Sequence, residues 1–250
     1  MIEHRTYPAF LLLMVIRYFL FAGVTFTVFY ILFKNKFAKL KIQKLFPKNK
    51  DYYREIRYSF STMVVFSLYA ILIFRSPFSQ FTQFYKNVNE HSIGYLFLSV
   101  VLAIIIHDTY FYWTHRIMHH PKLFRFFHLV HHKSTNPSPW AAYSFHPLEA
   151  LVEGGVIVVV VMVLPIHPIA IGLFLLFMIA FNVYGHLGYE IFPRWLLKTK
   201  VGHLFNTSTN HNMHHHFFKG NYGLYFRFWD ELMGTTHPKY QETLNQLKDL

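Results

Sequence analysis

The 250-residue sequence contains no cysteine. Disulfide bonds, thiolate zinc sites and iron–sulfur clusters ligated by this chain are therefore excluded. Charged residues are also scarce at 14%, against roughly 25% in an average soluble domain. Hydrophobic residues make up 53% of the chain. The combination predicts a protein that resides in a membrane.

The charge that is present is mostly positive, with a formal net charge of +12. Nine Lys and Arg residues accompany Asp51 and Glu55 within Lys34–Arg57. Because this charge lies beside apolar segments, anionic lipid headgroups and the positive-inside rule explain it better than nucleic acid does. We expect no nucleic-acid partner and place this segment in the cytoplasm, either as a loop or as an interfacial amphipathic helix.

Five apolar segments predict an all-α integral membrane fold. They are Tyr7–Phe33, Tyr58–Phe74, Ser92–Trp113, Ala150–Leu164 and Ile169–Tyr184. The last two are slightly short for a full crossing and are separated by a turn between Pro165 and Pro168. We expect four or five transmembrane or re-entrant helices, a cytoplasmic helical cap and no cleavable signal.

Three histidine clusters stand out from the apolar background. They are His115-x3-His119, His128-x2-His131-His132 and His211-x2-His214-His215. Residues three and four apart share a face of a helix, so each cluster is expected to direct two or three ring nitrogens at one point. Imidazole is a good ligand for zinc, copper, iron and nickel. Eight such rings can enclose a pair of metal ions.

The predicted topology brings these clusters to one face of the membrane. With the basic loop in the cytoplasm, the second and third spans return the chain to the cytoplasm at His115. The hairpin formed by the last two apolar segments leaves and returns again before His211. A single shared metal site on the cytoplasmic face is therefore possible, in a bacterial inner membrane or the endoplasmic reticulum.

The segment from His107 to Trp140, beginning His-Asp-Thr-Tyr-Phe-Tyr-Trp-Thr-His, resembles the fatty acid hydroxylase and sterol desaturase superfamily. Later stretches resemble it too, namely Gly185–Glu190, Asn210–His215, Gly220–Gly223 and Phe228–Thr235. The dipeptide His107-Asp108 and the stretch Ser144–Glu149 make the chain most similar to the sterol C5-desaturase-like branch of this superfamily. We divide the single membrane domain, 1–250, into N-terminal helices and basic loop (1–92), a catalytic region (93–237) and a tail (238–250).

This resemblance implies two iron ions, O2 as co-substrate, and hydroxylation or desaturation of an unactivated C–H bond in a sterol-like or fatty-acyl lipid. It also implies that the eight clustered histidines are metal ligands, and His186 matches a further family histidine. Asn182 departs from the pattern, because some hydroxylase members carry another histidine there.

The chemistry also demands components from outside the chain. Side chains cannot supply an oxidant strong enough for an aliphatic C–H bond, whereas an oxygen-activating metal can. Zinc has no redox chemistry but outcompetes ferrous iron for nitrogen ligands, so purified protein can hold zinc although activity requires iron. The chain shows no dinucleotide fingerprint and no His-Pro-Gly-Gly sequence. We therefore expect a separate electron donor of the ferredoxin, rubredoxin or cytochrome b5 type.

Several further residues are candidates for orienting the ligands, and we expect no catalytic residue apart from the metal ligands. These candidates are His107, Asp108, His146 and Glu149, followed by Glu190 and Asp230. Ordinary ion pairing with Arg116 or Lys133 is the alternative role for the acidic ones. His120 and His216 point off the ligand face and His203 is ambiguous, while His4, His91, His167 and His237 are predicted to be non-ligands. Aromatic residues from Tyr110 to Trp140 are candidates for lining a lipid tunnel, although core packing explains most of them as well.

Two other functions remain open at this point. A membrane zinc-dependent hydrolase usually has three protein ligands and one open position, so eight or nine histidines are too many. A metal-transport protein would hold its ligands within the spans near the midplane, whereas these follow spans.

Overall fold

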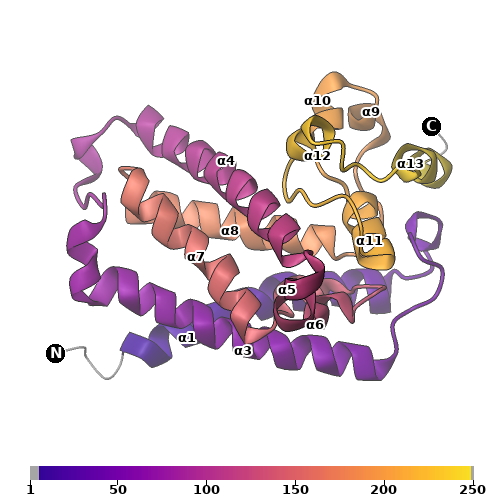
Figure 1. Cartoon of the computed structure of the whole chain (residues 1–250), viewed down its shortest axis with the longest axis horizontal. Coiled ribbons are helices and arrows are strands. Elements are labelled where there is room, and N and C mark those ends of the chain that lie inside the picture. The colour runs from indigo at the N-terminus through magenta and orange to yellow at the C-terminus, as the bar shows by residue number, and fades with distance from the viewer. Residues whose placement is uncertain (1–5, 249–250) are drawn as a thin grey trace.

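The computed structural model describes residues 6–248, and Figure 1 shows them as an elongated bundle of helices with a smaller helical cap at one end. Residues 6–248 contain no β-strand beyond three isolated bridges, which confirms the predicted all-α class. Four helices are long and apolar enough to cross a membrane: Tyr7–Leu32, α3 (Asn49–Arg75), α4 (Ile93–Met118) and α8 (Pro168–Gly185). The apolar helix α7 (Pro147–Val163) packs between them against α3 and α4, so the expected four or five membrane helices are present.

The remaining elements are short. The first span is α1 (Thr6–Tyr18) continued by η1 (Phe19–Gly23), α2 (Val24–Phe26) and η2 (Thr27–Leu32). The connections contain η3 (Ala38–Leu40), η4 (Pro77–Phe81), η5 (Val88–Glu90), α5 (Pro121–Phe127), α6 (Leu129–His132) and η6 (Pro139–Tyr143). The cap comprises α9 (Arg194–Leu197), α10 (Lys200–Leu204), α11 (Ser208–Phe217), α12 (Phe228–Leu232) and α13 (Tyr240–Lys248).

Two predicted boundaries were wrong. Helix α3 begins at Asn49, inside the predicted basic loop, because the backbone N–H of Lys48 bonds to the Asp51 carboxylate at 3.1 Å and caps the first turn. Helix α4 continues past Trp113 to Met118 and carries His115 within it. The additional turns contain charged and polar residues, so a prediction based on apolar runs did not include them in the helices.

The N-terminal part of the chain holds the segment that follows α8. The backbone N–H of Ile42 donates to the carbonyl of Gly188 at 3.1 Å, and that of Glu190 donates to the carbonyl of Leu40 at 2.8 Å. The Tyr30 hydroxyl donates to the carbonyl of Leu187 at 2.8 Å. The stretch that follows His186 is therefore held by hydrogen bonds to the N-terminal part of the chain.

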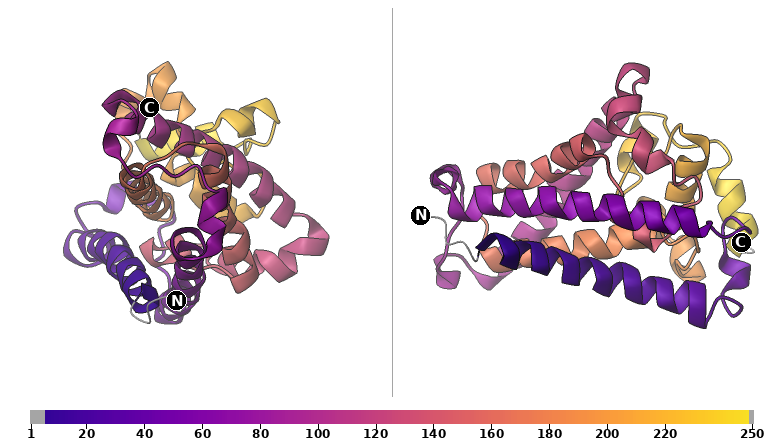
Figure 2. Two further views of the ribbon diagram at one scale, coloured as in Figure 1. Left: turned by 90° about the vertical axis from the view of Figure 1, so that its left-hand side faces the viewer. Right: turned by 90° about the horizontal axis from the view of Figure 1, so that it is seen from below.

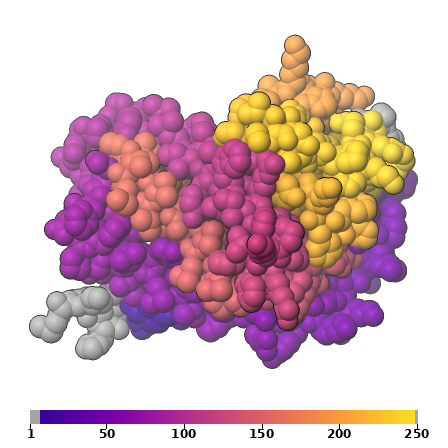
Figure 3. All heavy atoms as spheres, viewed as in Figure 1, coloured from indigo at the N-terminus to yellow at the C-terminus, as the bar shows by residue number. Residues whose placement is uncertain are grey.

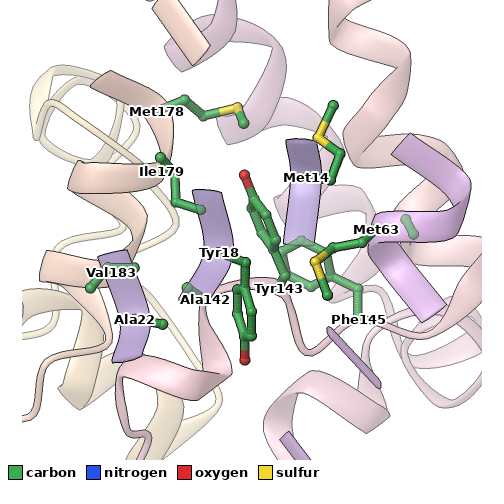
Figure 4. Close-up of a cluster of buried hydrophobic side chains, with 11 residues drawn as sticks. Met14, Tyr18, Ala22, Met63, Ala142, Tyr143, Phe145, Met178, Ile179 and Val183 are labelled. Carbon is green, nitrogen blue, oxygen red and sulfur yellow. The ribbon is translucent and has the colours of Figure 1, made fainter. Parts of the chain in front are cut away.

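A core of large side chains joins α1, α3, η6 and α8, as Figure 4 shows. The rings of Tyr18 and Tyr143 stack with their centroids 5.8 Å apart, and Met63 and Ile179 pack around them. The Tyr143 hydroxyl is directed toward the space between Met14 and Met178. This core places η6 deep in the bundle.

The cap is joined to the bundle through α4. The carboxylate of Asp108 accepts hydrogen bonds from the backbone N–H groups of Tyr225 and Phe226, at 2.7 and 3.1 Å. The right-hand view in Figure 2 shows the cap at the end of the bundle opposite the N-terminus, as Figure 1 does. In Figure 3 orange and gold residues of the cap lie beside the red-magenta segment that contains the first two histidine clusters.

Candidate metal centre

Nine histidines converge in two groups where the ends of α4 and α8 meet α6 and α11. The larger group has five members: His115, His119, His128, His132 and His214. The smaller group has four: His131, His186, His211 and His215. Within each group, the nitrogen that each ring offers lies within 4.8 Å of all the others. All nine are buried except His119, which is partly exposed.

The three sequence clusters do not each belong to a single group, contrary to the expectation that each cluster directs its ring nitrogens at one point. Residues four apart stay together, so His128 and His132 belong to the larger group, but His131 belongs to the smaller one. The last cluster divides in the same way, with His211 and His215 in the smaller group and His214 in the larger. The reason is geometric: consecutive helical residues are about 100° apart around the axis, so adjacent histidines face different directions.

The outer nitrogens of five rings are held by acceptors. The Nδ1 contacts are His115 with the Tyr222 carbonyl at 2.8 Å, His128 with the Glu149 carboxylate at 2.6 Å, His131 with the Ser144 carbonyl at 3.3 Å, His186 with the Asn182 carbonyl at 2.8 Å and His214 with the Gly220 carbonyl at 2.7 Å. A ring that donates from Nδ1 keeps a lone pair on Nε2. These acceptors therefore fix the tautomer that a metal ion requires.

The inner nitrogens face one another. In the larger group the Nε2 atoms of His119, His132 and His214 lie 3.0–3.1 Å apart. In the smaller group the Nε2 of His186 lies 3.0 Å from that of His211 and 3.3 Å from that of His131. His131 and His186 already donate from Nδ1, so their contact brings lone pair to lone pair. A cation between such atoms removes this conflict, and the residues fit a metal in each group.

Two further inner nitrogens support the same fit. The Nε2 atoms of His115 and His128 are buried without a hydrogen-bond partner in residues 6–248. A buried polar atom without a partner costs free energy, and such atoms in a native structure require an explanation. Ligation of a metal by these two atoms is a sufficient one.

The protonation of these rings also suits metal binding. Burial, followed by the proximity of neighbouring imidazoles, lowers the pKa of His131, His211 and His215 well below its usual value. Burial lowers the pKa of His186 to about 4. Near neutral pH these rings are therefore neutral, which is the ligand form.

Among the acidic candidates, only Glu149 contacts a clustered histidine directly. Asp230 instead accepts hydrogen bonds from the backbone N–H groups of Tyr222 and Gly223, at 2.9 and 2.8 Å, and Glu190 accepts one from that of Thr209 at 2.9 Å. Together with Asp108, they anchor the backbone of the segments that bear or hold the histidines. None of these four carboxylates pairs with Arg116 or Lys133, so the ion-pairing alternative is wrong for the described residues.

The other histidines lie outside both groups. His107 is buried and its Nδ1 lies 2.9 Å from the Tyr225 hydroxyl. His146 caps the start of α7: its ring accepts from the Leu148 N–H and its backbone N–H donates to the Glu149 carboxylate, so its described hydrogen bonds are with α7. His120, His203 and His216 are exposed, and His91, His167 and His237 make local contacts away from the groups. His4 lies outside the described residues.

Sequence reasoning missed the four backbone carbonyls that hold histidine rings. Any residue type can supply a carbonyl, so the sequence carries no direct signal for them. The turn at Gly220 was the nearest indication: Phe218, Gly220 and Asn221 all have positive φ. This left-handed backbone, which glycine adopts most readily, reverses the chain and directs the Gly220 carbonyl toward His214.

Residues 100–235 match the family described as Fatty acid hydroxylase. The chain is 29% identical to a Delta(7)-sterol 5(6)-desaturase of Gibberella zeae, over 73% of this chain and 55% of the relative. It is also 29% identical to the lathosterol oxidase of Mus musculus, over 74% of this chain and 61% of the relative. It therefore spans between half and two thirds of these relatives.

A shorter match is closer in sequence. Methylsterol monooxygenase 1 of Danio rerio is 35% identical over 52% of this chain and 44% of the relative. No solved structure matches the chain significantly.

Proposed function

The chain belongs to the fatty acid hydroxylase family, and from this premise we propose that it is a membrane-bound oxidase of lipids. It uses two iron ions, O2 and two externally supplied electrons to hydroxylate or desaturate an unactivated C–H position of a sterol-like or fatty-acyl lipid. The relatives named as sterol desaturases and lathosterol oxidase support the sterol-like alternative.

The observation that carries this proposal is the pair of histidine groups with their inner nitrogens free for ligation. The five-membered group would hold one iron and the four-membered group the other. When bound, the iron pair would supply the oxidising power that side chains lack. The protein's own contribution is to orient the rings through Nδ1, keep them neutral and exclude bulk water by burial.

The two alternative functions fit the geometry less well. A catalytic zinc site with three protein ligands does not match groups of five and four histidines. A transport site is expected near the bilayer midplane, but these histidines gather at the ends of α4 and α8, beside the cap. An oxygen-activating centre at one membrane face, which we assign to the cytoplasm, explains both features.

We place electron delivery at the loop that follows α11. A surface hollow there is lined by Lys219, Gly220, Tyr222 and His237 among others. The Tyr222 ring packs on His119 and His214, with centroids 5.1 and 5.6 Å apart, so one residue spans from the hollow to the candidate ligands. The positive net charge favours an acidic donor of the ferredoxin, rubredoxin or cytochrome b5 type.

Oxygen uptake with lipid extract tests the proposal. The purified chain, depleted of metal and reloaded with iron, should consume O2 when given reductant, a donor protein and lipid. Mass spectrometry should then detect a lipid that has gained one oxygen atom or lost two hydrogen atoms. The same chain loaded with zinc is the control, because zinc has no redox chemistry. Equal turnover with zinc, or lipid conversion without O2, would contradict an iron oxidase.

A further inference from the structure

A surface pocket beside the end of the first span carries charge of one sign only. Its charged lining residues are Lys34, Lys41 and Lys44, and its apolar wall includes Phe46 and Tyr189. None of the three lysines forms an ion pair in residues 6–248. Like charges around one pocket repel one another, and a bound anion would remove this repulsion. The lining therefore favours a negatively charged ligand.

Lys41 is the buried cation of this pocket. It is 3% exposed, and its Nζ lies 5.1–5.6 Å from the ring centroids of Tyr30, Phe46 and Tyr189. Burial, followed by the charge of the neighbouring pocket lysine, lowers its pKa to about 8, so most of the side chain is still charged at pH 7. Within residues 6–248 the Nζ donates one hydrogen bond, to the Gly188 carbonyl at 3.3 Å. An ammonium group has three donors, so this buried cation has donor capacity left for a ligand.

The pocket lies where a membrane surface is expected. The first span ends at Leu32, and Lys34 follows shortly after it. Beside the lysines, Phe33 is 46% exposed and Leu45 is 81% exposed. Exposed apolar side chains next to lysines at the end of a span are typical of an interfacial segment, in which the apolar groups enter the lipid and the ammonium groups meet the headgroups. The nearest abundant anions are therefore lipid phosphates.

The segment 41–44, which carries two of the lysines, also contacts the segments that bear the histidines. The Gln43 side chain donates to the Thr135 carbonyl at 2.8 Å and to the Asn212 side chain at 2.9 Å. Asn212 lies within the last histidine cluster, and Thr135 follows the second one closely. The Gly188 carbonyl accepts from the segment as well, in the turn after α8. A ligand that fixes 41–44 would therefore also restrain the surroundings of both histidine groups.

We propose that this pocket binds the phosphate headgroup of an anionic membrane lipid through Lys41 and Lys44, and that the bound headgroup holds the segment 41–44 against the histidine-bearing segments. Phosphate oxygens are strong acceptors, and their hydrogen bonds with ammonium groups are charge-assisted. Because Lys41 is recessed among aromatic rings, a single phosphate on a flexible headgroup can reach it, whereas the broad surface of an acidic protein would meet only the exposed lysines. This binding does not depend on the proposed oxidase function.

A matched pair of lipids tests the proposal on the unaltered chain. The metal-loaded protein in a neutral detergent is titrated with dioleoylphosphatidate or with dioleoylglycerol, which lacks only the phosphate, and native mass spectrometry counts the bound lipid. Phosphatidate should bind at least about tenfold more tightly, because hydrogen bonds to charged groups are lost with the neutral lipid. Equal binding of the two lipids would overturn the proposal. Displacement of phosphatidate by an equal concentration of inorganic phosphate would overturn the lipid assignment and identify free phosphate as the ligand.

Variants then locate the phosphate. Lys41→Met and Lys44→Gln should each weaken phosphatidate binding about tenfold and leave dioleoylglycerol binding nearly unchanged. Lys39→Met and Lys36→Gln are the matched controls, because they remove the same charge from exposed positions of the same loop outside the pocket. Lys44 is exposed, so Lys44→Gln decides the question even if Lys41→Met folds poorly. An equal loss of binding in test and control variants would show that phosphatidate responds only to net charge, and would overturn the pocket.

Amide hydrogen exchange tests the link to the histidine-bearing segments. The backbone N–H groups of Ile42 and Glu190 form hydrogen bonds between the basic segment and the turn after α8. Peptides that contain these groups should exchange about tenfold more slowly when phosphatidate is present at ten times its Kd, because opening then requires release of the lipid. Dioleoylglycerol should not slow this exchange, and neither should phosphatidate in Lys44→Gln. Unchanged exchange in the unaltered chain with phosphatidate bound would overturn the link, whether or not the chain oxidises a lipid.

Discussion

The Nδ1 atom of His128 lies 2.6 Å from the Oε1 atom of Glu149, and both side chains are fully enclosed. His128 follows α5, whereas Glu149 lies in the first turn of α7, so the contact joins two segments that are separated by η6. A carboxylate in this position orients the ring and increases its basicity as a ligand. The pair links the fold of the membrane helices directly to the candidate metal centre.

Removal of this carboxylate should weaken metal binding. We expect Glu149→Ala to lower the affinity for iron about 10- to 100-fold, and Glu149→Gln to have a smaller effect because the amide oxygen still accepts from Nδ1. Metal competition with a chelator measures the affinity. Glu90→Ala, at an exposed position, is the control. If Glu149→Ala held iron as tightly as the unaltered chain, the orienting role would be excluded.

The adjacent histidines His131 and His132 should ligate different metal ions. Because they belong to different groups, His131→Ala and His132→Ala should each lose one of the two metals, and the double variant should lose both. His131→Ala combined with His215→Ala should lose only one, since these two share a group. Metal content per chain after gel filtration measures each case, with His237→Ala as the control. Complete loss of both metals in every single variant would show that the two groups are not independent.

The sequence was sufficient to predict the membrane helices and the convergence of the clusters, and the reasons are local. Long apolar runs and the i, i+4 spacing of His115 and His119 depend only on neighbouring residues. The division between His131 and His132 depends on how α6 is rotated against the rest of the bundle. The carbonyl of Tyr222 and the anchoring of Tyr225 by Asp108 join residues more than 100 positions apart, which no local pattern encodes.

Asp230 should contribute far more to the stability of the fold and to its metal content than its neighbour Glu231. Asp230 is fully buried and accepts from two backbone N–H groups and the Thr235 hydroxyl, so Asp230→Ala leaves these donors unpaired. We expect a loss of about 3 kcal/mol in the free energy of unfolding, and reduced metal content because the Tyr222 carbonyl that holds His115 is displaced.

Glu231→Ala is the matched control for Asp230→Ala on the same helix. Glu231 is half exposed and pairs with Arg227 at 2.8 Å, so its loss should cost less than about 1 kcal/mol. Thermal unfolding in detergent and metal analysis compare the two variants. Similar behaviour of both would contradict an anchoring role for Asp230.

Lys41 should make the folded chain more stable as the pH rises through the alkaline range. It is buried among the rings of Tyr30, Phe46 and Tyr189, and burial, followed by the charge of Lys44, lowers its pKa to about 8 from 10.5. Between these two values the unfolded chain binds a proton that the folded chain does not, so stability rises with pH across this window. At pH 9.5 the contribution is about 2 kcal/mol relative to pH 7. Thermal unfolding of the unaltered chain should show this rise and Lys41→Met should lack it, whereas parallel curves for the two proteins would show that Lys41 stays protonated in the fold.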